Sequence, residues 1–304
     1  MAAIRKITFV GMGALGLLFA DLISRSEHAY DVSFVMDAER YDRYRGREFS
    51  VNGRTVGFRR VRSEDAVPAD LVIFAVKYPG LEAALDTAAN SVGPETVIIS
   101  LLNGVTSEKI IGERFGAEKV ITCVAQGMDA NRSGGSLTYS SPGELHLGIL
   151  PGQDPAKLED LCAFLEEAGI SYVREQDIRY RLWFKFMLNV AVNQVCMIYD
   201  TDYSGCMAPG LPRALTISAM REVIALAGAE GVALGEEDIG TVIRINESLG
   251  SSGKPSMGQD RDARRPSEVE MFSGAVIAMA KEHGIPVPVN EYIHGKVREI
   301  ESSY

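Results

Sequence analysis

The chain has 304 residues, of which 46% are hydrophobic and 24% charged, with a formal net charge of −10 and an isoelectric point of about 5.1. This length allows two domains and a sizeable core. The acidic balance disfavours nonspecific binding to nucleic acid or anionic membrane, and no dense run of lysine and arginine offsets it. We therefore expect neither a nucleic-acid partner nor a membrane partner.

The N-terminal run "ITFVGMGALGLLFA" (7–20) follows Lys6 and has some features of a secretion signal. It is too short to cross a bilayer, and its glycines fit a strand, a turn and a helix better. The four cysteines show no C-x-x-C spacing and the four histidines are scattered, so neither a disulfide framework nor a metal site is predicted. These observations indicate a cytoplasmic protein.

The first part of the chain alternates short apolar runs with helical patterns or turns. The runs are rich in valine and isoleucine, and they lie at 6–10, 31–36, 70–77, 96–102 and 119–125. Such alternation predicts a parallel sheet covered by helices on both faces. A hairpin or edge strands at 136–150, an amphipathic helix at 154–169 and a last strand at 170–175 complete a Rossmann-type domain over residues 1–175.

After about residue 176 the strand signals vanish. Helices are predicted at about 177–198, 212–231, 236–249, 267–283 and 291–302, and the stretch "GSSGKPSMGQ" (250–259) resembles a loop. The sequence therefore predicts an α/β domain followed by an all-helical domain over residues 176–304. The apolar helical half could support a homodimer.

A glycine-rich loop follows the first predicted strand and opens a helix. Its spacing is G-x-G-x-x-G, formed by Gly11, Met12, Gly13, Ala14, Leu15 and Gly16. The first glycine permits a tight turn, the second a close approach to a pyrophosphate, and the third close helix–strand packing. Because strand, loop and helix occur in the right order, the loop predicts a dinucleotide site at a helix N-terminus.

Three polar residues, Asp37, Lys77 and Asn103, lie at the ends of the second, third and fourth predicted strands, at the edge of a parallel sheet where ligands bind. Asp37 could accept hydrogen bonds from the adenosine ribose, which favours NADH, although Arg40 nearby could neutralise a 2′-phosphate; alternatively, Asp37 only caps the next helix. Lys77 could meet cofactor oxygens, or simply face solvent. Asn103 could bind the nicotinamide ribose or the substrate, or belong to an ordinary Asn-Gly turn.

Within the predicted helix at 177–198, the only polar residues from Leu182 to Ile198 are Lys185, Asn189, Asn193 and Gln194, and the first three recur every fourth residue. In an α-helix this spacing forms one narrow polar stripe. A buried ammonium group is costly unless it is paired. The stripe is therefore either a functional surface, or a lysine that reaches water with two amides that cap backbone groups.

The sequence resembles the ketopantoate reductases (2-dehydropantoate 2-reductases) over nearly its whole length. The matching motifs are "GMGALG" (11–16), "VK" (76–77), "NG" (103–104), "KFMLNVAVN" (185–193), "SMGQD" (256–260), "RRPSEVE" (264–270) and "HGIPVPVN" (283–290). The resemblance implies an NAD(P)H-dependent reduction of a 2-keto acid, with ketopantoate as first candidate, in pantothenate and coenzyme A synthesis.

The resemblance also assigns roles to residues. Lys185 matches the catalytic lysine that donates a proton to the developing alkoxide, and Glu268 matches a glutamate that holds the substrate or this lysine. Ser256, Asn189 and Asn193 match substrate-binding residues. Asn103 matches an asparagine between cofactor and substrate, and Lys77 a lysine on the cofactor side. The polar stripe would then line the substrate site.

Three departures from the family pattern favour a different substrate or cofactor. Many members have an arginine in place of Asp37, which suits NADPH, so NADH becomes a candidate here. Substrate-binding asparagines of some members correspond to Tyr203 and Gly253. Another branched or aromatic 2-keto acid is therefore an alternative substrate. A non-catalytic NAD(P)-sensing regulator is a third interpretation, against which Lys185, Ser256 and Glu268 argue.

Overall fold

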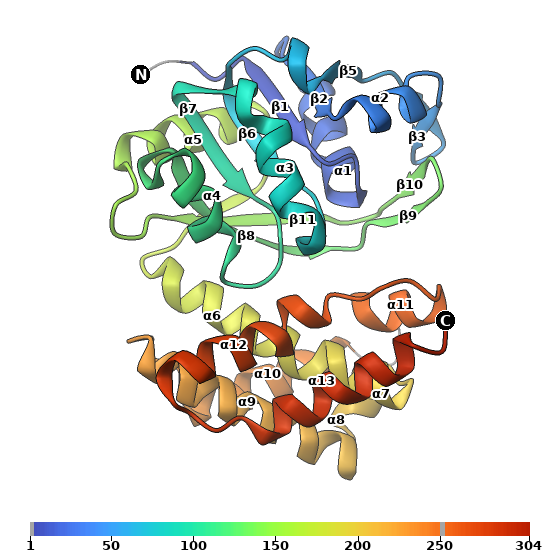
Figure 1. The fold of residues 1–304 in the computed structure, drawn as a ribbon, viewed down its shortest axis with the longest axis vertical. Helices are drawn as coiled ribbons and strands as arrows, with labels where there is room; N and C mark the ends of the chain where they lie inside the picture. The colour runs from blue at the N-terminus through green and yellow to red at the C-terminus, as the bar shows by residue number, and fades with distance from the viewer. Residues whose placement is uncertain (1–2, 250–252) are drawn as a thin grey trace. The chain divides into compact units, whose positions relative to one another are not determined.

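The computed structural model describes residues 3–249 and 253–304, which divide into two compact units, Met1–Ile178 and Arg179–Tyr304. We call them the N-terminal and C-terminal units (Figure 1). The N-terminal unit is mixed α/β, and every element described in the C-terminal unit is helical. The predicted fold class, an α/β sheet domain followed by an all-helical part, is confirmed.

The N-terminal unit is built on an eight-stranded sheet with the order β12-β11-β8-β7-β6-β1-β2-β5. From β5 to β8 in this order, each strand pairs in parallel with its neighbour, whereas β11 is antiparallel to β8. The strands are β1 (Lys6–Val10), β2 (Asp31–Met36), β5 (Arg59–Arg62), β6 (Ala69–Phe74), β7 (Val92–Ser100), β8 (Val120–Met128), β11 (Pro142–Gly148) and β12 (Tyr172–Arg174).

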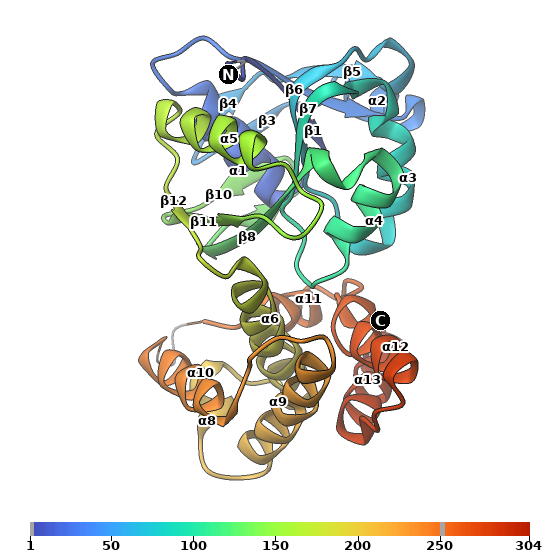
Figure 2. The same cartoon turned by 90° about the vertical axis from the view of Figure 1, so that its left-hand side faces the viewer.

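Helices cover both faces of this sheet. Figure 2 shows α1 and α5 on one face and α3 and α4 on the other. The helices of the unit are α1 (Ala14–Ser24), α2 (Ala38–Tyr44), α3 (Leu81–Ala88), α4 (Ser107–Phe115) and α5 (Pro155–Glu167). Phe9 and Phe34 stack in the core beneath α1, with ring centroids 5.2 Å apart. The fully buried strands explain why the sequence shows continuous apolar runs rather than alternation.

A second sheet of four short strands was not predicted. Its order is β4-β3-β10-β9, and its strands are β3 (Phe49–Val51), β4 (Arg54–Val56), β9 (Asn131–Ser133) and β10 (Ser136–Thr138). Each strand has only three residues, too few for a period of two to stand out. The sheet packs against α1 through β3 and β10.

The C-terminal unit is a helical bundle around the long apolar run Ile178–Tyr199. This run comprises α6 (Ile178–Leu188), a π-helical segment (Asn189–Asn193) and α7 (Gln194–Tyr199). The other helices are α8 (Tyr203–Met207), α9 (Leu211–Ala229), α10 (Glu236–Leu249), α11 (Ser256–Asp262), α12 (Ser273–His283) and α13 (Pro288–Glu301). Among the described residues, this run alone is long and apolar enough to cross a membrane, but 78% of its most apolar window is buried, as in a core helix.

Two predicted boundaries in this unit were wrong. The expected loop at 250–259 includes the start of α11 at Ser256, while residues 250–252 lie outside the described part. The expected helix at 267–283 begins only at Ser273, after a 3-10 turn at Val269–Met271. Short helices such as α11 take their stability from packing rather than from propensity, so the sequence gives little local sign of them.

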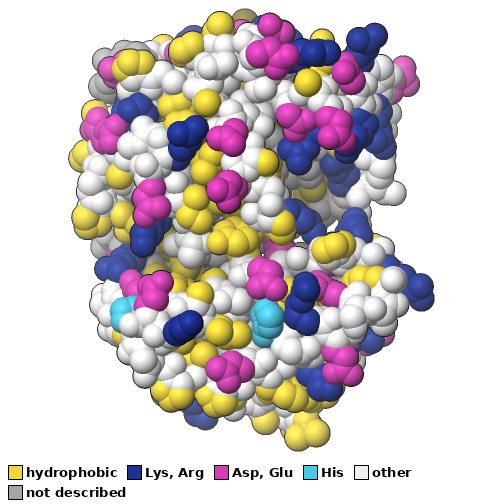
Figure 3. Space-filling model, viewed as in Figure 1, with side chains coloured by type: hydrophobic (Ala, Val, Ile, Leu, Met, Phe, Trp, Pro, Cys, Tyr) yellow, Lys and Arg dark blue, Asp and Glu magenta, His cyan; other side chains and the backbone are white. Residues whose placement is uncertain are grey.

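On the face drawn in Figure 3, acidic and basic side chains are interspersed.

Candidate functional site

The glycine loop between β1 and α1 closes on the loop that follows β6. Gly11 has a φ of +108°, and a Cβ added to it would stand 2.5 Å from the carbonyl oxygen of Ala75. A Cβ added to Gly16 would stand 2.2 Å from the carbonyl oxygen of Gly11. Gly11 is therefore needed for the turn, and Gly16 for the close contact between helix and loop. Sequence reasoning missed Ala75, whose only signal is its small size just after a strand.

Gly13 differs from the other two glycines because the folded chain does not itself require it. Its φ is −81°, and an added Cβ would meet only the Ala75 carbonyl oxygen, at the ordinary contact distance of 3.4 Å. Gly13 is the N-cap of α1, where no side chain caps the helix and no acidic residue lies in the first turn. The absence of a side chain at Gly13 and the positive end of the helix dipole both fit the pyrophosphate of a dinucleotide.

Asp37 directly follows β2 and is the N-cap of α2. Its Oδ1 accepts a hydrogen bond from the backbone N–H of Arg40 at 2.7 Å, and its Oδ2 lies 3.4 Å from the Arg40 guanidinium. The capping interpretation is thus confirmed as one role of this residue. Both side chains are 44% exposed, so carboxylate and guanidinium remain accessible to a ligand together.

Lys77 and Asn103 do not end their strands, as the sequence had suggested. The strand β6 ends at Phe74 and β7 at Ser100, so each residue lies three positions further on, in a loop. The error arose because apolar residues continue past the last ladder pair in both places. Lys77 is exposed and Asn103 is half-buried.

Sheet register brings the loops of the N-terminal unit to one edge. Val10 is aligned with Val35 of β2 and Phe74 of β6, and Phe74 is aligned with Ser100 of β7. The glycine loop, Asp37, Lys77 and Asn103 therefore follow neighbouring strand ends at the carboxyl edge. The chain order reverses between β1 and β6, and such a switch point is where open α/β sheets bind ligands.

In the C-terminal unit, the polar stripe spans two kinds of helix. Lys185 lies on α6 and is half-buried, whereas Asn189 and Asn193, which are 7% and 5% exposed, bound the π-helical segment. The prediction of a regular α-helix was wrong here. A π turn holds more residues than an α turn, so it offsets the angular drift of a four-residue spacing. Single π turns in helices are frequent at functional sites.

The structure connects the two asparagines to Ser256. The Nδ2 of Asn193 lies 3.3 Å from Asn189 Oδ1 and 3.4 Å from Ser256 Oγ, which makes two long hydrogen bonds. Ser256 is the exposed first residue of α11, and α11 packs against α7. Three of the residues predicted to bind substrate therefore form one polar cluster. Asn189 is its member nearest to Lys185 along the helix, four positions further on.

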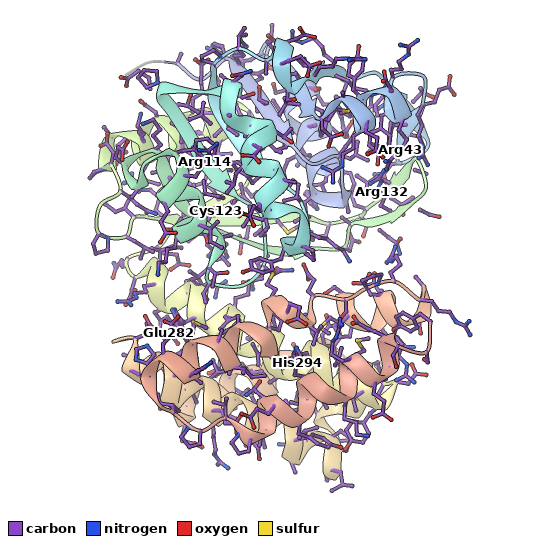
Figure 4. The ribbon with its side chains drawn as sticks, in the orientation of Figure 1. Arg43, Arg114, Cys123, Arg132, Glu282 and His294 are labelled. Carbon is purple, nitrogen blue, oxygen red and sulfur yellow. The ribbon has the colours of Figure 1, made fainter. Side chains whose placement is uncertain are left out.

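Glu268 lies on a segment whose residues before and after it are bonded to α13. The backbone N–H of Ser267 donates to Glu301 Oε1 at 2.7 Å, and His294, labelled in Figure 4, lies 3.2 Å from the Glu270 carboxylate. The carbonyl oxygen of Glu268 accepts from the N–H groups of Met271 and Phe272. Hydrogen bonds therefore hold the backbone on both sides of Glu268, and the residue is half-buried.

Two family models match the chain and together span most of it. The ketopantoate reductase PanE/ApbA model matches residues 7–152, and the ketopantoate reductase PanE/ApbA C-terminal model matches residues 177–301. The 2-dehydropantoate 2-reductase of Archaeoglobus fulgidus is 27% identical over 305 residues, covering 98% of this chain and 99% of that protein.

Solved structures show the same fold. The 2-dehydropantoate 2-reductase of Geobacter metallireducens has a TM-score of 0.83 and 28% identity, over 97% of this chain and 99% of that one. A D-mandelate dehydrogenase in complex with NADH has a TM-score of 0.86 over 98% and 99% of the two chains. At 24% identity, this second likeness concerns the fold alone.

Proposed function

The chain belongs to the ketopantoate reductase family and is an NAD(P)-dependent oxidoreductase of that type; we propose that it reduces a 2-keto acid to the 2-hydroxy acid, with ketopantoate as first candidate. One observation carries the proposal. Asn189 and Asn193, on the helix that carries Lys185, form a cluster of hydrogen-bonding side chains with Ser256 of α11. Such a cluster suits a small, polar, anionic substrate.

In the proposed reaction, bound NAD(P)H supplies the hydride to the ketone carbon. Lys185 Nζ donates a proton to the ketone oxygen as negative charge develops on it, and its own positive charge stabilises that oxygen beforehand. Ser256 Oγ and the Asn193 amide donate hydrogen bonds to the substrate carboxylate. Glu268 orients the substrate or the ammonium group of Lys185.

We propose that Gly13 and the N-terminus of α1 hold the pyrophosphate and that Asp37 binds the adenosine ribose. Lys77 and Asn103 would contact the cofactor, Asn103 on the side of the substrate. The exposed carboxylate of Asp37 repels a 2′-phosphate and so favours NADH. Arg40 beside it weakens this preference without reversing it.

The test is the initial rate of cofactor oxidation with ketopantoate, measured in parallel with NADH and NADPH. Wild-type protein should turn over, and Lys185→Ala should lose turnover by orders of magnitude while still binding cofactor. Cofactor binding without turnover of any 2-keto acid would instead favour a non-catalytic, NAD(P)-sensing protein.

A second candidate substrate, a 2-keto acid with a branched or aromatic side chain, is favoured by one contact. The Tyr203 ring lies beside Gly253, where an added Cβ would stand 3.8 Å from its Cε2. Tyr203 is half-buried, and this burial raises the pKa of its hydroxyl. We propose that this pair forms the far end of the substrate site. Higher kcat/KM with phenylglyoxylate or 2-ketoisovalerate than with ketopantoate would support this candidate.

A further inference from the structure

The buried side chain of Gln194 connects the helix that carries Lys185 to the segment that carries Glu268. Gln194 follows the π-helical segment directly and is fully buried, with 0% of its surface exposed. Its Oε1 accepts a hydrogen bond of 2.7 Å from Ser273 Oγ. Ser273 is also fully buried and is the first residue of α12, one residue beyond the 3-10 turn (Val269–Met271) that Glu268 precedes.

The other end of the same amide supports the π turn. In a regular α-helix the backbone N–H of residue 194 would donate to the carbonyl of residue 190. Here the N–H of Gln194 donates to the Ala191 carbonyl, and the Gln194 side chain donates to the Val190 carbonyl at 2.6 Å. The side chain of Gln194 is thus hydrogen-bonded to the backbone of the π-helical segment itself.

We propose that Gln194 is a positioning residue for the reaction. Its amide stabilises the π turn that sets Asn189 and Asn193 relative to Lys185, and through Ser273 it fixes this turn against the segment of Glu268. This inference rests on the proposed function of Lys185 and Glu268. Gln194 itself touches neither substrate nor cofactor, since both of its amide ends are bonded inside the unit.

Gln194→Met, Ser273→Ala and the double variant test the inference. Gln194→Met keeps the side-chain volume but removes both hydrogen bonds. We expect its kcat/KM for the 2-keto acid to fall at least tenfold, its dissociation constant for the cofactor to stay within twofold, and amide exchange at residues 189–195 to accelerate. The double variant should lose no more kcat/KM than Gln194→Met alone, because Ser273 acts through Gln194.

The chain offers a matched control in Asn246. It is equally buried, and its amide also donates to a backbone carbonyl four residues earlier, that of Val242 at 2.8 Å. Asn246→Leu also removes a buried amide, one whose Oδ1 has no hydrogen-bond partner among the described residues, and should leave kcat/KM and exchange at 189–195 unchanged. An equal loss of kcat/KM in this control would reduce Gln194 to a general stability role.

Two further outcomes separate this inference from the proposed function. A folded Gln194→Met protein with wild-type kcat/KM, or with unchanged exchange at 189–195, overturns the positioning role and leaves the function standing. Failure of wild-type protein to turn over any 2-keto acid, or undiminished turnover in Lys185→Ala, contradicts the proposed function itself.

Discussion

The carbonyl oxygen of Gly11 stands 2.2 Å from the point that a Cβ at residue 16 would occupy. Since both partners are backbone, neither can turn away as a flexible side chain would. Gly16→Ala should therefore displace α1 or the loop, reduce cofactor binding at least tenfold and lower the melting temperature by several degrees. Fluorescence titration with NADH and a thermal melt measure both effects. Unchanged values would mean that the loop relaxes freely.

Gly13→Ala should separate binding from folding. The backbone φ of −81° suits alanine, and its Cβ would meet only an ordinary contact. The melting temperature without cofactor should stay near that of the wild type, while the affinity for NADH falls, because the methyl group occupies the space proposed for the pyrophosphate. Equal affinity in the two proteins would place the pyrophosphate elsewhere.

Asp37→Ser separates two roles of Asp37, the capping of α2 and the negative charge of its carboxylate. Serine also caps helices, so the free energy of unfolding should change by less than about 0.5 kcal/mol. Removing the negative charge should raise the ratio of kcat/KM with NADPH to that with NADH by about tenfold. Parallel rate measurements with both cofactors provide the test. A constant ratio would leave Asp37 as a helix cap alone.

Glu222 should be one of the more important residues for the stability of the C-terminal unit. Its carboxylate accepts from the backbone N–H of Val289 at 2.8 Å, and from the N–H and the side-chain amide of Asn290 at 2.8 and 2.7 Å. It thereby caps α13 from α9. We expect Glu222→Ala to cost about 2–3 kcal/mol in urea unfolding, against less than about 0.5 kcal/mol for the exposed Glu291→Ala.

The ionisation of Tyr180 should make the free energy of unfolding depend on pH in the alkaline range. Burial, and then the hydrogen bond of 2.5 Å to Asp238, raise the pKa of the Tyr180 hydroxyl from 10.0 to about 12. A raised folded-state pKa means that the neutral phenol is favoured by folding. Its contribution is complete below pH 10 and is lost as the pH rises toward 12.

The measurement is the unfolding free energy of wild type and Tyr180→Phe as a function of pH. Their difference should be constant below pH 10 and shrink between pH 10 and 12. Absorbance titration of the phenolates should lose one late-titrating group in the variant. A constant difference up to pH 12 would show that Tyr180 ionises as freely in the folded protein as in the unfolded chain.

Elements of the fold were predicted best from the sequence where their residue pattern is long. Each buried parallel strand is a continuous apolar run, and the glycine loop has three positions with distinct requirements, of which the structure bears out those of Gly11 and Gly16. The four strands of three residues in the second sheet, and the five-residue helix α8, depend on contacts between residues distant in sequence. The periodic pattern of hydrophobic residues along the sequence does not reveal such contacts.

The candidate site shows the same division. Lys185, Asn189 and Asn193 were visible as a stripe because they share one helix. Ser256 and Glu268 carried no local signal and were identified only through the family resemblance. Gln194 was overlooked because a buried glutamine reads as one more polar residue, and only its two hydrogen bonds reveal a connection to Ser273.

The π turn at residues 189–193 also bears on insertions and deletions in this helix. A π turn is equivalent to one residue inserted into an α-helix. Deleting a single residue such as Ala191 would let the helix become regular while the parts before and after the deletion keep nearly their present rotation, because the π turn already accommodates the extra residue. Asn193 would then stay near the line of Lys185. Elsewhere in α6 or α7, where the helix is regular, the same deletion would turn everything after it by about 100°. The π turn is therefore the place in this helix where a change of length by one residue disturbs the rest least.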